Sequence, residues 1–119
     1  MLISTKATNL ELTLAISRYV NKKLTALGRL VRAQDESAHA EVEIEKTTAH
    51  HRSGDVFRAE INLHIAGKRF RAEVTTNDLY AAIDAMKDEI ERALESHKDK
   101  RLTLRKKGGQ KVKSMLHGK

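Results

Sequence analysis

A group of basic side chains recurs at helical spacing within a stretch that contains no acid. Its members are Arg18, Lys22, Arg29 and Arg32. At 100° per residue they lie within about 80° of one another on one helix face. Acids normally accompany such cations, because opposite charges three or four residues apart stabilise a helix and like charges repel. The pattern therefore favours contact with a polyanion such as the RNA backbone, with a merely solvated face as the alternative.

The remaining excess of positive charge lies at the C-terminal end. Residues 100–119 contain eight of the 23 Lys and Arg side chains and no acid, which leaves 15 basic and 16 acidic side chains in residues 1–99. We therefore expect a nearly neutral folded body, followed by a basic tail at residues 102–119 that is disordered when free. The tail either binds phosphates or serves only to keep the protein soluble.

The other residue types that could do chemistry lack the neighbours that chemistry requires. His50 and His51 precede Asp55, but adjacent residues seldom direct both side chains to one metal ion, so we expect no metal site and no cofactor. The sequence contains no nucleophile elbow, no phosphate-binding glycine loop and no HExxH motif, so we do not expect an enzyme. With no Cys and no apolar run of roughly 20 residues or signal peptide, a cytoplasmic protein is expected.

Two helices are predicted from apolar residues that recur every three or four positions. The first helix begins after the N-cap Thr13, and its apolar stripe consists of Ile16, Val20, Leu24, Leu27 and Val31. Gly28 should weaken this helix by roughly 1 kcal/mol relative to Ala. The second begins after the N-cap Asp78, and its stripe consists of Leu79, Ile83, Met86, Ile90, Leu94 and His97. Acids, among them Asp84, dominate its opposite face, with Arg92 to one side, so it is not a uniform phosphate-binding surface.

Strands are predicted where apolar and polar residues alternate strictly, at residues 38–45, 57–65 and 69–75, with a further short strand at 2–5. Gly67 indicates a tight hairpin turn at residues 66–68, and residues 46–55 should form a longer polar loop. The outer face of this sheet mixes acids with arginines and lacks aromatic side chains, which argues against an RNA-binding platform there. The predicted fold is a β-α-β-β-β-α two-layer α+β sandwich, with a mostly antiparallel four-stranded sheet covered by two helices on one face.

Several short segments, in their order and spacing, resemble the ribosome hibernation-promoting factor and ribosome-associated inhibitor family. The most specific is the block formed by Asp78, Leu79, Tyr80, Ala81, Ala82, Ile83 and Asp84. Weaker matches lie at residues 10–13, 23–27, 57–60 and 97–100. The resemblance covers roughly residues 1–101 and indicates a short family member with a fold like that of double-stranded-RNA-binding domains. The residues of this motif that are expected to be architectural are Asp78, Tyr80, Ala81, Ala82, Ile83 and Asp84.

The resemblance implies a function in translation. It predicts binding to the small ribosomal subunit in the mRNA and tRNA channel near the decoding centre, which inhibits initiation and stores idle ribosomes. The basic residues corresponding to the family's RNA contacts are Lys22, Lys23, Arg92, Lys98 and Lys100. Glu89 and Ser96 occupy positions that are often basic in the family, so part of the contact could pass to Arg101 and the tail.

Combining charge pattern and resemblance, we predict an rRNA-binding set on both helices. It consists of Arg18, Lys22, Lys23, Arg29, Arg32, Arg92, Lys98, Lys100 and Arg101. The free protein is expected to be monomeric. Two alternatives stay open from the sequence, a general double-stranded-RNA-binding protein and a regulator that binds another protein through its acidic second helix.

Overall fold

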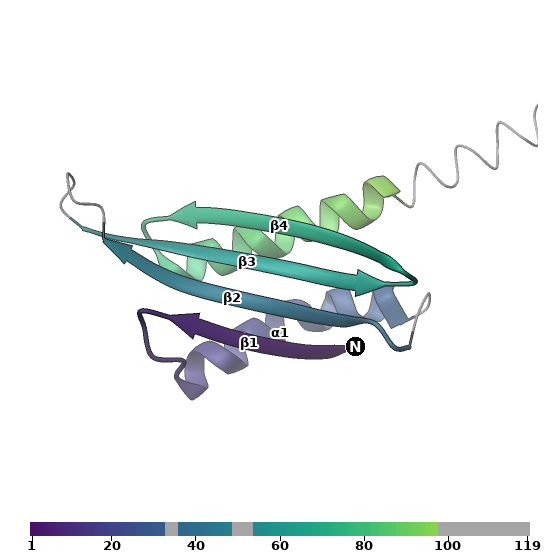
Figure 1. The fold of residues 1–119 in the computed structure, drawn as a ribbon, viewed down its shortest axis with the longest axis horizontal. Coiled ribbons are helices and arrows are strands. Elements are labelled where there is room, and N and C mark those ends of the chain that lie inside the picture. The colour runs from purple at the N-terminus through teal and green to yellow at the C-terminus, as the bar shows by residue number, and fades with distance from the viewer. Residues whose placement is uncertain (33–35, 49–53, 98–119) are drawn as a thin grey trace, which may run out of the picture.

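The computed structural model describes residues 1–32, 36–48 and 54–97. The elements follow in the order β1 (Leu2–Thr8), α1 (Leu14–Arg32), β2 (His39–Thr48), β3 (Asp55–Ile65) and β4 (Lys68–Thr76). A second helix then occupies residues 79–97. The four strands form one sheet in the order β1-β2-β3-β4, and both helices cover the same face of it (Figure 1). The predicted β-α-β-β-β-α two-layer fold is confirmed.

Strand pairing follows from the lengths of the connections. Pairs β2–β3 and β3–β4 are antiparallel, whereas β1 and β2 are parallel. Parallel neighbours need a crossover, and α1 supplies it. In Figure 1, α1 lies behind β1 and β2, and the second helix lies behind β3 and β4.

The strands are longer than alternation alone predicts. β1 continues to Thr8 because its backbone pairs in register with β2 up to Glu45. Residues 46–48 and 55, expected in the long loop, instead extend the β2–β3 ladder as far as the pair Thr48–Asp55. The extension is held by an ion pair of 3.4 Å between Lys46 and Asp55. The part of the expected loop at residues 49–53 lies outside the described residues.

The core lies between the sheet and the helices, where the predicted stripes meet. All five apolar residues of the α1 stripe are buried, as are the five apolar residues of the second stripe. From the sheet, the apolar inward residues of β2 and most of those of β3 complete the same cluster. Phe57 and Phe70 are only partly buried and pack at its margin.

Turns and caps set the ends of the elements. The hairpin between β3 and β4 has two loop residues, and both have positive φ, 50° at Ala66 and 75° at Gly67. Two consecutive positive φ angles are typical of the type I′ turn that suits the twist of a hairpin. The N-terminus of α1 is capped by Thr13, whose Oγ1 accepts from Ile16 N–H at 3.2 Å. Asp78 caps the second helix, and its Oδ2 accepts from Ala81 N–H at 2.9 Å.

Candidate nucleic-acid interface

The outward face of α1 holds a set of cations that no acid of the described chain neutralises. Arg18, Lys22 and Arg29 are all exposed. None of the ion pairs formed among the described residues involves these three side chains. Arg32 is the last residue of α1, and its side chain lies outside the described part. We call Arg18, Lys22 and Arg29 the α1 cations.

The helix itself explains this arrangement. The stripe that begins at Ile16 is buried against the sheet, so the residues roughly 180° away must point to solvent. The first turn of α1 contains no acidic residue. A row of cations on a rigid helix, with no internal partner, is suited to contact successive phosphates of a nucleic acid.

Lys23 differs from the α1 cations because it lies on the flank that faces the second helix. Its Nζ lies 3.2 Å from Asp84 Oδ1, and Tyr19 Oη donates to the same oxygen at 2.6 Å. The hydrogen bond to Asp84, together with its negative charge, raises the pKa of Lys23. The same carboxylate is the main reason that the pKa of Tyr19 is raised. Asp84, expected among the exposed acids of the second helix, thus joins that helix to α1.

The tyrosines strengthen the same junction. Tyr80 contacts Tyr19 edge-on, with ring centroids 4.8 Å apart and planes at 85°. Such edge-to-face pairs add about 0.5–1.5 kcal/mol beyond the area that they bury. We call Tyr19, Lys23, Tyr80 and Asp84 the helix junction. Its members come from two segments 65 positions apart, so single-segment periodicity could not reveal it.

The second helix presents fewer free cations in the described part. Arg92 is exposed and has no ion pair among the described residues. Lys87 pairs with Glu91 at 2.7 Å, and Glu91 raises the pKa of this lysine. Glu89 and Ser96 are both exposed. Lys98, Lys100 and Arg101, which the sequence also assigns to the RNA-binding set, lie outside the described residues, as does the tail.

The central part of the outer sheet face, around Arg58 and Arg71, neutralises its own charges. Arg58 pairs with Glu43, with Glu45 at 2.9 Å and with Glu60 at 3.2 Å, and it lies 3.7 Å from Glu73. Arg71 adds ion pairs with Glu60 at 2.6 Å and Glu73 at 2.5 Å. Burial lowers the pKa of Arg58, but hydrogen bonds to Glu45 and Glu43 outweigh it and raise the pKa overall. We call these six residues the sheet network.

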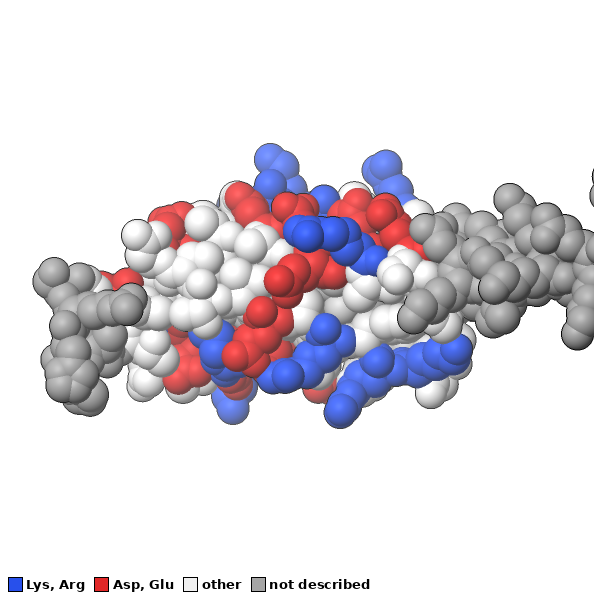
Figure 2. Space-filling view, turned by 90° about the horizontal axis from the view of Figure 1, so that it is seen from above, with Lys and Arg blue, Asp and Glu red and all other residues white. Residues whose placement is uncertain are grey.

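The sheet network therefore carries two positive and four negative charges and offers little to a phosphate. Figure 2 views the molecule edge-on, from the side of β4 and the second helix, and shows both acidic and basic side chains on this side. Among the faces of the described chain, the outward face of α1 is the best candidate for a nucleic-acid interface.

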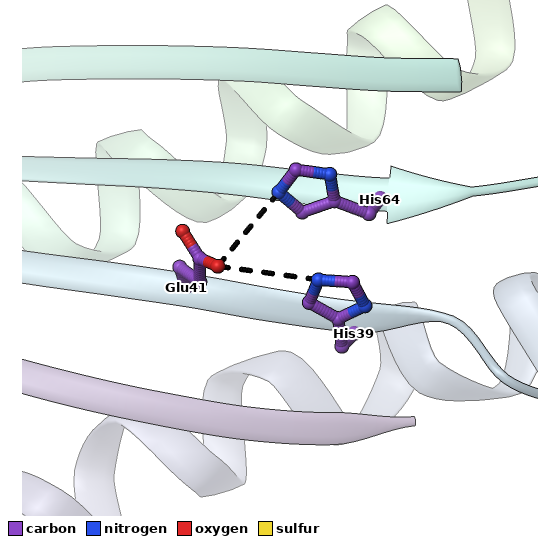
Figure 3. A group of neighbouring side chains, drawn as sticks. All are labelled: His39, Glu41 and His64. Carbon is purple, nitrogen blue, oxygen red and sulfur yellow. Dashed lines mark ion pairs between the residues drawn. The ribbon is translucent and has the colours of Figure 1, made fainter. Parts of the chain in front are cut away.

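One further cluster was missed by sequence reasoning. His39, Glu41 and His64 gather on the outer face of the sheet at one end of β2 and β3 (Figure 3). Only the β2–β3 register, which pairs His39 with His64, could have revealed it. Within the described ranges 1–32, 36–48 and 54–97, no helix is both long enough and apolar enough to cross a bilayer.

Comparison with known proteins adds an independent line of information. Residues 3–102 match the family described as sigma 54 modulation protein / S30EA ribosomal protein. The ribosome hibernation promoting factor of Klebsiella oxytoca is 32% identical over 92 residues, covering 77% of this chain and 87% of the relative. Its Escherichia coli K12 counterpart is 30% identical over 100 residues, covering 84% and 96%.

Longer relatives and solved structures agree with this. The ribosome hibernation promotion factor of Bacillus subtilis is 30% identical over 92 residues, which make up 77% of this chain but only 46% of that protein. The crystal structure of the N-terminal domain of Thermus thermophilus Protein Y is similar, with a TM-score of 0.66 and 35% identity, covering 82% of this chain and 99% of that one. A ribosomal subunit interface protein from Coxiella burnetii shares the fold, with a TM-score of 0.61 and 17% identity, covering 83% and 99%.

Proposed function

This chain belongs to the sigma 54 modulation protein / S30EA ribosomal protein family, and on that premise we propose that it binds the small ribosomal subunit through the α1 cations. Family membership makes it a ribosome-associated hibernation protein and not an enzyme. The proposed site is the mRNA and tRNA channel near the decoding centre. Occupation of that channel in the cytoplasm would block initiation and keep idle ribosomes in store.

The observation that carries the proposal is the absence of acidic partners for the α1 cations within the described chain. Each cation that meets an rRNA phosphate releases condensed counterions, and this release favours binding. α1 has 19 residues, so at 1.5 Å per residue it is a rigid rod about 28 Å long. Phosphate contacts fix position more than sequence choice, so the shape of the ribosomal channel supplies the specificity.

The helix junction gives Lys23 a second role. Its ion pair with Asp84 joins the two helices, and the Lys23 side chain is still 37% exposed. In the proposal, Lys23 binds a phosphate at the edge of the interface while it remains paired with Asp84. Tyr80 and Asp78 serve the architecture, one at the helix junction and the other as a cap.

The proposal gives the second helix and the tail a supporting part. Arg92 assists from the described helix, together with Arg32, Lys98, Lys100 and Arg101. Because Glu89 and Ser96 occupy positions that are often basic in the family, the second helix offers fewer cations, and α1 supplies the larger share of the phosphate contacts. Residues 1–101 then form the ribosome-binding domain of a monomeric protein, and residues 102–119 form a basic tail that adds affinity.

A charge reversal tests this assignment. Lys22→Glu/Arg29→Glu should reduce cosedimentation with purified small subunits by about tenfold or more, because two phosphate contacts become repulsions. The matched control is Lys6→Glu/Arg69→Glu, which makes the same charge change at exposed positions of β1 and β4. The control should bind as the wild type does.

Competition separates the proposal from its alternatives. Excess short RNA duplex should not displace the protein from small subunits, and displacement would indicate a general double-stranded-RNA-binding protein. Nuclease footprints on the rRNA should cover the decoding region. Translation inhibition that survives the reversal would point to a regulator acting through another surface.

A further inference from the structure

His39, Glu41 and His64 direct their side chains toward one point on the outer face of the sheet. His39 lies directly opposite His64 in the β2–β3 register, and Glu41 follows two residues along β2 on the same face. Glu41 Oε1 lies 4.0 Å from His39 Nε2 and 3.9 Å from His64 Nε2. Figure 3 shows both rings presenting a nitrogen to this carboxylate.

The three side chains form a donor set that transition metals favour. Two imidazoles and one carboxylate are the protein ligands of a common class of zinc site in which a fourth position stays open. Zinc bonds to such ligands are about 2.0–2.2 Å long, so tetrahedral ligand atoms lie about 3.3 Å apart. The candidate ligand atoms all lie within 4.8 Å of one another. Each side chain therefore has to move only slightly.

The setting permits that movement. The side chains of His39, Glu41 and His64 are 45%, 62% and 35% exposed, so small rotamer changes meet little resistance. The two rings already stack, with centroids 4.3 Å apart and planes at 11°, which places their donor edges side by side. They border an open hollow of about 340 Å³ through which an ion could enter.

From this geometry we propose that His39, Glu41 and His64 bind one divalent ion of the zinc class. The ion joins β2 to β3 close to the 66–67 turn and keeps one coordination position open to solvent. Glu41 supplies negative charge, whereas Arg69, opposite His64 on β4, opposes the ion and limits its affinity. The site lies on the face of the sheet away from the helices, so it is independent of the proposed RNA interface on α1.

Titration of the full chain with Zn²⁺ in a non-chelating buffer tests the site. Calorimetry should detect one ion per chain, and saturating Zn²⁺ should raise Tm by roughly 4 °C or more, because an ion that binds the folded state stabilises it. His39→Ala and His64→Ala should abolish this binding. Glu41→Gln should weaken it by more than about tenfold, because the loss of even an outer-shell partner typically costs about 10–100-fold in affinity.

The chain offers a matched control in its other neighbouring histidines. His50→Ala/His51→Ala removes the same number of imidazoles and should leave the affinity and the Tm shift unchanged. Circular dichroism checks that the variants at His39, Glu41 and His64 fold. In the wild type, the amide NMR signals that shift on addition of Zn²⁺ should centre on residues 39–41 and 62–64. The inference is overturned if the wild type binds no Zn²⁺, if binding survives loss of His39 and His64, or if the control loses it.

Discussion

Arg58 lies on the outer face of the sheet with four carboxylates around it, whereas Arg18 and Arg29 on α1 have no acid within ion-pair distance among the described residues. The same guanidinium group therefore does different work in the two places. In the sheet network its charge is neutralised by carboxylates of the same and neighbouring strands, and the ion pairs connect these strands. On α1 it remains available to an external anion.

Glu60 shows how the sheet network responds to pH. A hydrogen bond from Arg71 lowers the pKa of Glu60 below its ordinary 4.5, although partial burial acts in the opposite direction. A carboxylate with a lowered folded-state pKa stabilises the fold above its unfolded pKa, and this contribution is lost as pH falls through the folded value. Glu60→Gln should therefore cost about 1 kcal/mol of unfolding free energy at pH 7. Urea denaturation measures this directly.

The pH dependence of that loss is the decisive part. The difference between wild type and Glu60→Gln should persist at pH values above 4.5, and it should shrink as pH falls through the lowered folded-state pKa of Glu60, where the wild-type carboxyl becomes protonated. Glu11→Gln is a suitable control, because Glu11 is exposed and has no ion pair among the described residues. A Glu60→Gln difference that grows on acidification would contradict the role given to Arg71.

At the scale of the element, α1 carries both the core stripe and the α1 cations, so its stability controls how well the cations are placed. Gly28 is the weak point of this helix. It is buried, and a methyl group added there would meet Met1 at 3.9 Å and 4.0 Å, which is ordinary van der Waals contact.

Gly28→Ala should consequently stabilise the protein by about 0.5–1 kcal/mol, because alanine loses less backbone entropy on entering a helix. Thermal unfolding followed by circular dichroism measures the gain. The same substitution at Gly67, where φ is 75°, should instead lower Tm, because alanine is strained at positive φ. A loss of stability at position 28 would show that α1 is packed too tightly there.

Elements with a strong period could be predicted from sequence, and contacts between elements could not. The apolar stripes that begin at Ile16 and at Leu79 are buried as expected, because an amphipathic helix removes its apolar face from water by packing that face against the core. The extension of β2 to Thr48 was missed because it depends on pairing with β3 and not on alternation. The helix junction at Asp84 and the cluster at His64 were missed for the same reason.

For the whole molecule, the two layers divide the charged surface. The outer sheet face contains the sheet network and the proposed metal site, and the helical side presents the α1 cations. The residues of the predicted RNA-binding set therefore differ in how available their charges are. Lys23 forms an ion pair with Asp84, whereas its neighbour Lys22 is exposed and forms no ion pair among the described residues. A nearly neutral folded body with one cationic helix face is the charge distribution that we expect of a member of a family of ribosome-associated proteins.

The salt dependence of binding to purified small subunits tests the central claim most directly. The slope of log K against log salt concentration should be about −0.7 to −0.9 per phosphate contact. Arg18→Ala/Lys22→Ala/Arg29→Ala should reduce its magnitude by about 2–3, because three contacts are lost. Lys6→Ala/Arg69→Ala/Arg71→Ala, with the same change in net charge on the sheet face, should leave the slope unchanged. Equal slopes for the wild type and the α1 variant would contradict the account.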